Sequence, residues 1–171
     1  MQHSIVVMGV AGCGKSSVAD ALAQAEGLPL VEGDNFHSAQ SRDKMSRGIA
    51  LTDADRQGWL ATLGTQLQQP GGPIVLTCSA LKRSYRDLLC DGHPSVWFAH
   101  ADTSEEVLTE RLAARKGHYM PPSLLRSQLD TLEPLGDDEP GAVVSGEGSV
   151  EQTVADFLGE LCDERKIQLP S

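Results

Sequence analysis

The sequence predicts an α/β protein in which a five-stranded parallel sheet is flanked by helices. This prediction rests on short apolar, β-rich runs that alternate along the chain with longer stretches of helical pattern. A length of 171 residues suits one domain with a proper core, and no repeat, low-complexity tract or long linker divides the chain. We therefore expect a single domain over residues 1–171.

Each expected element is supported by local patterning. Continuous apolar runs bounded by turn residues are typical of strands buried on both faces, and Ser104 followed by Glu105 and Glu106 is typical of a capped helix start. The strands are expected at 4–9, 28–34, 73–79, 95–101 and 141–146, and the helices at 15–26, 53–69, 81–90, 104–115, 121–132 and 149–164. Ligands of such parallel sheets bind outside the carboxyl ends of the strands.

Composition narrows the possible partners. The net charge of −10 disfavours general binding to nucleic acid, because an acidic surface repels a phosphate backbone. No apolar run approaches the length that crosses a bilayer, and the N-terminus does not resemble a signal peptide. Four scattered cysteines without a C-x-x-C pair are expected to be free thiols. We expect a cytoplasmic protein that binds neither nucleic acid nor membrane.

The first strand leads into a phosphate-binding loop. Gly9, Gly14, Lys15 and Ser16 match G-x-x-x-x-G-K-[ST], which predicts the P-loop NTPase fold. Glycines let the backbone N–H groups turn toward phosphates, Lys15 is expected to bridge the β- and γ-phosphates of ATP, and Ser16 is expected to bind Mg²⁺. The expected nucleotide contacts are Gly9, Val10, Ala11, Gly12, Cys13, Gly14, Lys15, Ser16 and Ser17.

Missing motifs narrow the class of nucleotide-binding protein. The guanine-specifying N-K-x-D is absent, and the run 73–79 ends in Thr77, Cys78 and Ser79 rather than in the acidic residue of a Walker B strand. A short chain with this loop and without those elements favours a small-molecule kinase. A nucleotide-binding regulatory module without phosphotransferase activity is the alternative from another class.

Charged residues after the second strand suggest an acceptor site. Asp34 is expected at the carboxyl edge of the sheet, where a carboxylate can accept a proton from a substrate hydroxyl; capping of the next helix is the structural alternative. Within 25 residues follow His37, Lys44, Arg47, Asp53, Arg56 and Trp59. Arg56 is suited to a bidentate contact with a carboxylate.

Further cations follow the third strand and precede a Gly- and Pro-rich bend. Lys82, Arg83 and Arg86 fall in the first turns of a helix, where the helix dipole disfavours cations, which suggests a nearby anion. Before the bend come Arg111, Arg115, Lys116 and His118.

Five separated motifs give the chain a resemblance to a known family. "GVAGCGKSS", "GDNFH", "DKMSRGIALTDADRQGWL", "CSALKRSYRDLL" and "RLAARKGHYMP" together resemble the gluconate kinases (gluconokinases), over about residues 5–135. These are P-loop enzymes related to shikimate and nucleoside monophosphate kinases. The resemblance implies Mg²⁺-assisted, ATP-dependent phosphorylation of D-gluconate at its 6-hydroxyl, a lid over about 115–135, a mobile substrate-binding segment over about 35–60, and a homodimer.

The resemblance also implies roles for individual residues. Asp34 would orient or deprotonate the acceptor hydroxyl, the lid residues Arg111 and Arg115 would stabilise charge on the transferred phosphoryl group, and Arg83 would stay on the surface. The implied gluconate contacts are Asp34, His37, Lys44, Arg56, Lys82, Arg86 and His118. The family usually has Pro and Asn where this chain has Ser38 and Ser41, so a kinase of shikimate or another sugar acid remains the alternative. Gln128 and residues 132–134 also resemble the family, without a role that the sequence defines.

Overall fold

A computed structural model describes residues 3–91, 95–115 and 121–168. The five predicted strands form one parallel sheet in the order β2-β3-β1-β4-β5, which confirms the predicted fold class. The strands are β1 (Ser4–Met8), β2 (Leu30–Glu32), β3 (Val75–Thr77), β4 (Val96–Asp102) and β5 (Gly141–Ser145). The central strand β1 pairs Val6 with Leu76 on one side and with Phe98 on the other.

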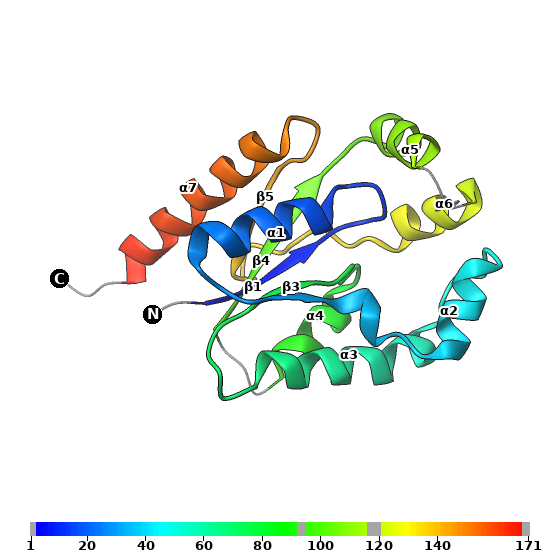
Figure 1. Ribbon diagram of the computed structural model, residues 1–171, viewed down its shortest axis with the longest axis horizontal. Coiled ribbons are helices and arrows are strands. Elements are labelled where there is room, and N and C mark those ends of the chain that lie inside the picture. The colour runs from blue at the N-terminus through cyan, green and yellow to red at the C-terminus, as the bar shows by residue number, and fades with distance from the viewer. Residues whose placement is uncertain (1–2, 92–94, 116–120, 169–171) are drawn as a thin grey trace.

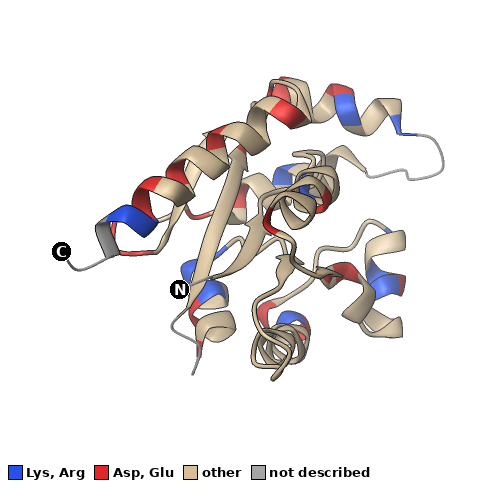
Figure 2. Ribbon diagram, turned by 60° about the vertical axis from the view of Figure 1, so that its left-hand side comes forward, with Lys and Arg blue, Asp and Glu red and all other residues tan. Residues whose placement is uncertain are grey.

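The described helices lie on both faces of the sheet (Figure 1). They are α1 (Lys15–Glu26), α2 (Ala39–Ser46), α3 (Asp53–Leu67), α4 (Arg83–Cys90), α5 (Glu105–Ala114), α6 (Pro122–Thr131) and α7 (Val150–Gln168), with a 3₁₀ turn η1 (Gly33–Phe36) after β2. Among these residues no helix is long and apolar enough to cross a membrane. Charged residues occur mainly on helices and loops, and the strands contain few of them (Figure 2).

Two apolar clusters fill the space between the sheet and the helices. On one face Ile5 and Val7 of β1 pack with Leu22 of α1 and Phe157 of α7. On the other face Val6 and Met8 belong to a cluster that includes side chains of α3 and α4, as well as Leu108 of α5 and Leu125 of α6. Successive residues of β1 thus face opposite clusters, as expected for a strand covered on both sides.

The sequence analysis missed α2. This helix is short and carries little apolar surface, so it lacks the periodic signal from which the longer helices were predicted. Its start is nevertheless encoded, because the Ser38 hydroxyl caps the helix by accepting a hydrogen bond from the Ser41 backbone N–H at 3.1 Å. The two serines that depart from the gluconate kinase pattern therefore form the N-terminal cap of this helix.

A capping box starts α3 at the predicted place. The Thr52 hydroxyl accepts from the Asp55 backbone N–H, and the Asp55 carboxylate accepts from the Thr52 N–H. This cap places Asp53 and Arg56 in the first turn of α3, close to the carboxyl edge of the sheet. The other predicted boundaries differ by a few residues, and the largest difference is at α7, which extends to Gln168 rather than to residue 164.

Candidate active site

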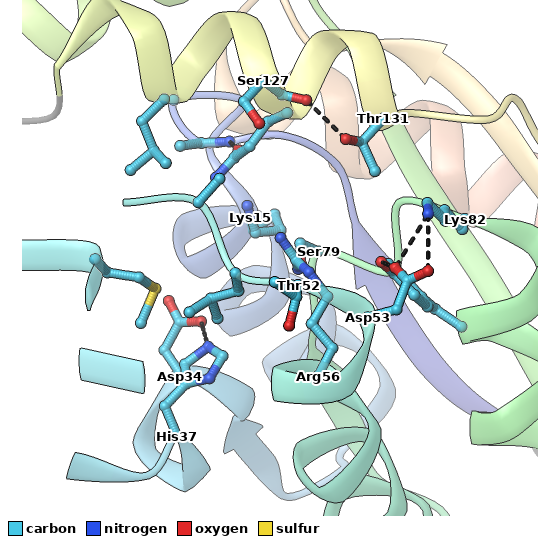
Figure 3. A pocket seen from close by; sticks show the side chains of 18 of the residues that line it. Lys15, Asp34, His37, Thr52, Asp53, Arg56, Ser79, Lys82, Ser127 and Thr131 are labelled. Carbon is cyan, nitrogen blue, oxygen red and sulfur yellow. Dashed lines mark hydrogen bonds and ion pairs between the residues drawn. The ribbon is translucent and has the colours of Figure 1, made fainter. Parts of the chain in front are cut away.

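A cavity of about 510 Å³ lies at the carboxyl edge of the sheet. Its walls come from the phosphate loop, η1, the first turn of α3, the loop between β3 and α4, and one face of α6. Figure 3 shows Lys15 in the middle of this space, with Asp34 and His37 on one side, Asp53 and Lys82 on another, and Ser127 and Thr131 of α6 across from them. Segments from most of the chain therefore meet in one site.

The phosphate loop has the tight backbone that its motif requires. Gly9 has φ +140°, and a Cβ there would lie 2.7 Å from Cys13 Sγ, so a side chain would both strain the loop and clash with it. The Lys15 ammonium group donates to the carbonyls of Gly9 and Val10 at 3.0 and 3.2 Å. The side chains of Val10 and Cys13 are buried, and neither residue lines the cavity.

Glu32 is a site residue that the sequence analysis missed. The Ser16 hydroxyl donates to Glu32 Oε2 at 3.3 Å, and the Thr77 hydroxyl donates to the same oxygen at 2.6 Å. The parallel register sets Glu32 beside Thr77, so the acidic residue near the phosphate loop comes from β2 rather than from β3. The available signal was an acidic residue at the last position of the second strand, two residues before Asp34.

Asp34 is held by an aromatic stack. The His37 ring stacks on Trp59 with centroids 4.1 Å apart, and Trp59 Nε1 donates to the Gly33 carbonyl at 2.9 Å. His37 Nε2 lies 3.5 Å from Asp34 Oδ1, while the Asp34 side chain is 82% exposed toward the cavity. The hydrogen bond from His37 lowers the pKa of Asp34, and the charge of Lys15 lowers it further. Asp34 is therefore an anion at neutral pH.

A second group of charges lines the opposite wall. Lys82 Nζ donates to both carboxylate oxygens of Asp53, at 3.0 and 3.2 Å, and the Tyr85 hydroxyl also bonds to Asp53. The hydrogen bonds from Tyr85 and Lys82 lower the pKa of Asp53. The Arg56 guanidinium lies 5.5 Å from the centre of the Tyr85 ring. Arg56 lines the cavity, while its Nε is buried and has no hydrogen-bond partner among the described residues.

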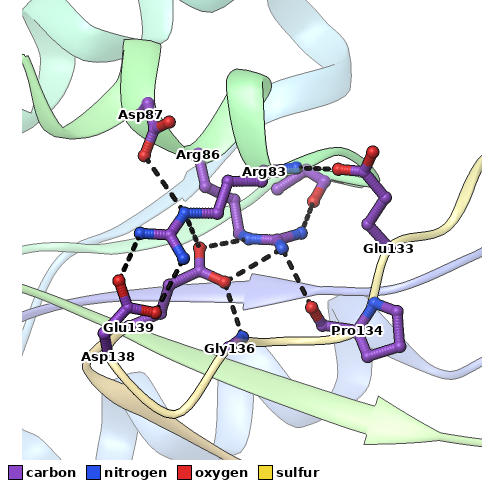
Figure 4. A network of polar contacts seen from close by, with 9 residues as sticks. Arg83, Arg86, Asp87, Glu133, Pro134, Gly136, Asp138 and Glu139 are labelled. Carbon is purple, nitrogen blue, oxygen red and sulfur yellow. Dashed lines mark hydrogen bonds and ion pairs between the residues drawn. The ribbon is translucent and has the colours of Figure 1, made fainter.

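Arg86, which the resemblance implies as a substrate contact, is buried away from the cavity. Its side chain is only 1% exposed and does not line the cavity; Nε and Nη2 donate to Glu139 at 2.7 and 3.1 Å. The remaining donors bond to the carbonyls of Ala80 and Pro134 (Figure 4). Lys82 precedes α4 and reaches the cavity, whereas Arg86 is one turn further on and points into the protein, toward the 134–139 loop.

The other predicted cations take different positions. Lys44 donates to both oxygens of Asp55 at 2.9 Å and lies outside the cavity lining. Arg111 bridges the carbonyls of Gly12 and Gly146, at 3.3 and 2.6 Å, and so ties the phosphate loop to the end of β5. Arg115 lines the cavity, and its charge contributes to the lowered pKa of Asp34. Lys116 and His118 lie outside the described residues.

Fold and site together indicate the class of protein. A phosphate loop and an ionised carboxylate share one small cavity, so an acceptor hydroxyl can reach the terminal phosphate of a nucleotide there. This arrangement is that of the P-loop small-molecule kinases. A family model described as AAA domain matches residues 5–135. The gluconokinase of Gluconobacter oxydans is 52% identical over 146 residues, which make up 84% of this chain and 82% of that protein. The chain belongs to the gluconokinase family.

Solved structures agree with this assignment. The crystal structure of a gluconokinase from Sinorhizobium meliloti 1021 has a TM-score of 0.89 and 46% identity, over 95% of this chain and 93% of that chain. A shikimate kinase from Bacteroides thetaiotaomicron has a TM-score of 0.67 at 15% identity, over 94% of this chain and 98% of that chain. The second likeness is one of fold alone.

Proposed function

We propose that the protein transfers the γ-phosphoryl group of ATP to the 6-hydroxyl of D-gluconate. Gluconokinase activity follows from membership of the family, because relatives named gluconokinase match most of this chain. The structural observation that supports it most directly is the shared cavity, in which Lys15, Asp34 and Arg56 meet (Figure 3). In the reaction the hydroxyl oxygen bonds to the γ-phosphorus, the bond from that phosphorus to the β–γ bridging oxygen breaks, ADP leaves with the electron pair, and the hydroxyl proton is released to water.

The phosphate loop and Glu32 support the donor side of the proposal. Loop N–H groups and Lys15 would hold the phosphates, and the Ser16 hydroxyl beside the Glu32 carboxylate offers the oxygen ligands that Mg²⁺ prefers. Bound Mg²⁺ would neutralise charge on the β- and γ-phosphates.

Arg56 and Lys82 support the acceptor side. Gluconate carries one carboxylate at the end opposite its 6-hydroxyl, and the Arg56 guanidinium in the cavity lining suits that anion. Asp34 would accept a hydrogen bond from the 6-hydroxyl. Its lowered pKa makes it a weak base, so its main contribution is to orient the hydroxyl for in-line attack. Arg115 would stabilise charge on the transferred phosphoryl group, while Arg111 would support the loop through Gly12.

A panel of acceptors tests the proposed substrate. ADP release is measured with ATP and Mg²⁺ in the presence of gluconate, other sugar acids, shikimate or buffer alone. We expect gluconate to have the highest kcat/KM, because its length spans from a carboxylate site to a hydroxyl at the phosphate. A rate with gluconate no higher than the rate with buffer alone would refute the proposal. A higher kcat/KM for shikimate or another sugar acid would show that this compound, and not gluconate, is the preferred acceptor.

We also propose a homodimer, as the resemblance implies, and a cytoplasmic location, as the composition suggests. Size-exclusion chromatography with light scattering gives the mass in solution, and a value near 18.3 kDa would contradict the dimer.

A further inference from the structure

One face of α6 forms a wall of the cavity. Leu124, Ser127, Gln128 and Thr131 all line it, and their spacing of three and four residues puts them on the same side of the helix. At its C-terminal end the helix is held to the segment before α4, because the Glu133 N–H donates to the Leu81 carbonyl at 2.7 Å. The Arg83 N–H donates to the Glu133 carboxylate at 2.6 Å. This wall is thus attached firmly enough to position a side chain.

Gln128 connects this wall to the phosphate loop. Its Oε1 accepts a hydrogen bond from the Ala11 backbone N–H at 2.7 Å, although the two residues are 117 positions apart in the chain. Because a backbone N–H needs an oxygen acceptor, this bond determines which way the side-chain amide is turned. The amide nitrogen then carries two donors, and no described residue accepts from them. Gln128 lines the same cavity as Lys15 and Asp34.

We propose that Gln128 is a catalytic residue that donates from Nε2 to the phosphoryl group as it passes from ATP to the acceptor. The inference rests on the proposed function. Charge in this reaction spreads over the three equatorial oxygens of the phosphoryl group, so a donor already in place lowers the barrier. The bond to Ala11 matters because it holds the Gln128 amide in a constant position relative to the loop that binds the nucleotide. A neutral amide also adds no charge to a wall that already faces Lys15 and Arg115.

Two substitutions separate this contact from a purely structural link. Gln128→Glu keeps an acceptor for the Ala11 N–H but removes the amide donor, whereas Gln128→Met keeps the length of the side chain and removes both. We expect kcat to fall about 10- to 100-fold in both variants, with KM for ATP and for the acceptor changed less than about threefold in Gln128→Met. Gln152→Met, on the exposed face of α7, is the matched control and should keep full kcat. Wild-type kcat in Gln128→Glu would overturn the proposal and leave only the structural link.

A binding measurement tests the same contact without turnover. ADP with aluminium fluoride and the acceptor mimics the phosphoryl group in transfer, and its effect on the melting temperature is compared with that of ADP alone. We expect Gln128→Met to lose much of the extra stabilisation from aluminium fluoride and to keep the effect of ADP. Equal responses in the variant and the wild type would overturn the proposal. If the panel replaces gluconate by another acceptor, the proposed substrate fails, while these measurements still test Gln128 with the acceptor so found.

Discussion

Asp34 owes its orientation to residues that do not touch the reacting atoms. The Trp59 indole is fixed by the Gly33 carbonyl, the His37 ring stacks on that indole, and His37 in turn bonds to Asp34. This sequence of contacts makes His37 a positioning residue for the carboxylate, in addition to any contact with the substrate. The hydrogen bond from His37 also explains why the pKa of Asp34 lies below its ordinary value.

Asp34→Asn is expected to lower kcat about 100-fold or more, because a neutral amide is a weaker acceptor for the hydrogen bond that orients the hydroxyl and can turn a donor toward the substrate. The affinity for ATP should stay close to that of the wild type, since the phosphate loop holds the nucleotide. Steady-state kinetics and an ATP titration measure the two effects. Asp43→Asn removes a carboxylate that pairs with Arg47 at the surface of α2, and it should leave kcat unchanged. Wild-type turnover in Asp34→Asn would remove Asp34 from the chemistry.

At the scale of elements, α4 is joined to the 133–139 segment by a buried ion pair. Arg86 and Glu139 are both nearly inaccessible, and Glu139 also accepts from the Gly136 N–H at 2.8 Å (Figure 4). Arg83 forms a second pair with Asp138 at 2.7 Å, but both of these side chains are well exposed. A buried pair is costly to break, because the remaining charge has lost its water and its partner. The two neighbouring pairs should therefore differ greatly in their importance for stability.

Glu139→Gln is expected to lower the free energy of unfolding by about 2 kcal/mol, since Arg86 stays buried with a neutral partner that still accepts one hydrogen bond. Asp138→Asn is the matched control; the exposed pair is screened by water, so we expect no resolvable change. Urea unfolding followed by circular dichroism measures both variants. Equal stability losses in the two would contradict the distinction between the buried and the exposed pair.

The whole molecule concentrates its chemistry at one edge of the sheet. The strands are parallel, so loops from β1, β2 and β3 meet at their carboxyl ends, and α6 completes the cavity. Although the net charge is −10, four cations among the described residues line this cavity: Lys15, Arg56, Lys82 and Arg115. Local positive charge at the site can thus attract two anionic substrates to an acidic protein.

The stabilisation caused by each ligand should distinguish the two halves of this cavity: the ATP half around Lys15 and the gluconate half around Arg56. A ligand at about 100 times its Kd raises the free energy of unfolding by about 2.7 kcal/mol. We expect Lys15→Ala to lose the rise in melting temperature caused by ATP but to keep the rise caused by gluconate. Arg56→Gln should show the reverse. Thermal melts with each ligand alone measure this, and a loss of both responses in either variant would show that the two halves are not independent.

The sequence by itself determined the order along the chain of the strands and of the helices other than α2, together with the phosphate loop and the family. These features depend on local patterns: continuous apolar runs, helix caps such as Thr52 with Asp55, and glycines at set spacing in a loop that must wrap phosphates. The sequence also showed that Ser38 and Ser41 differ from the usual residues of the family. It did not show that they cap α2, because a short polar helix has no periodic apolar pattern from which it can be predicted.

Only the tertiary structure decided which charged and polar residues face the cavity. Lys82 and Arg86 are four residues apart, yet one lines the cavity and the other is buried against Glu139. Glu32 reaches Ser16 because the parallel register sets β2 beside β3, and Gln128 reaches Ala11 across 117 residues of chain. The physical reason is that a side chain's partner depends on which elements pack together and in what register, and neither is encoded in the residues on either side of it.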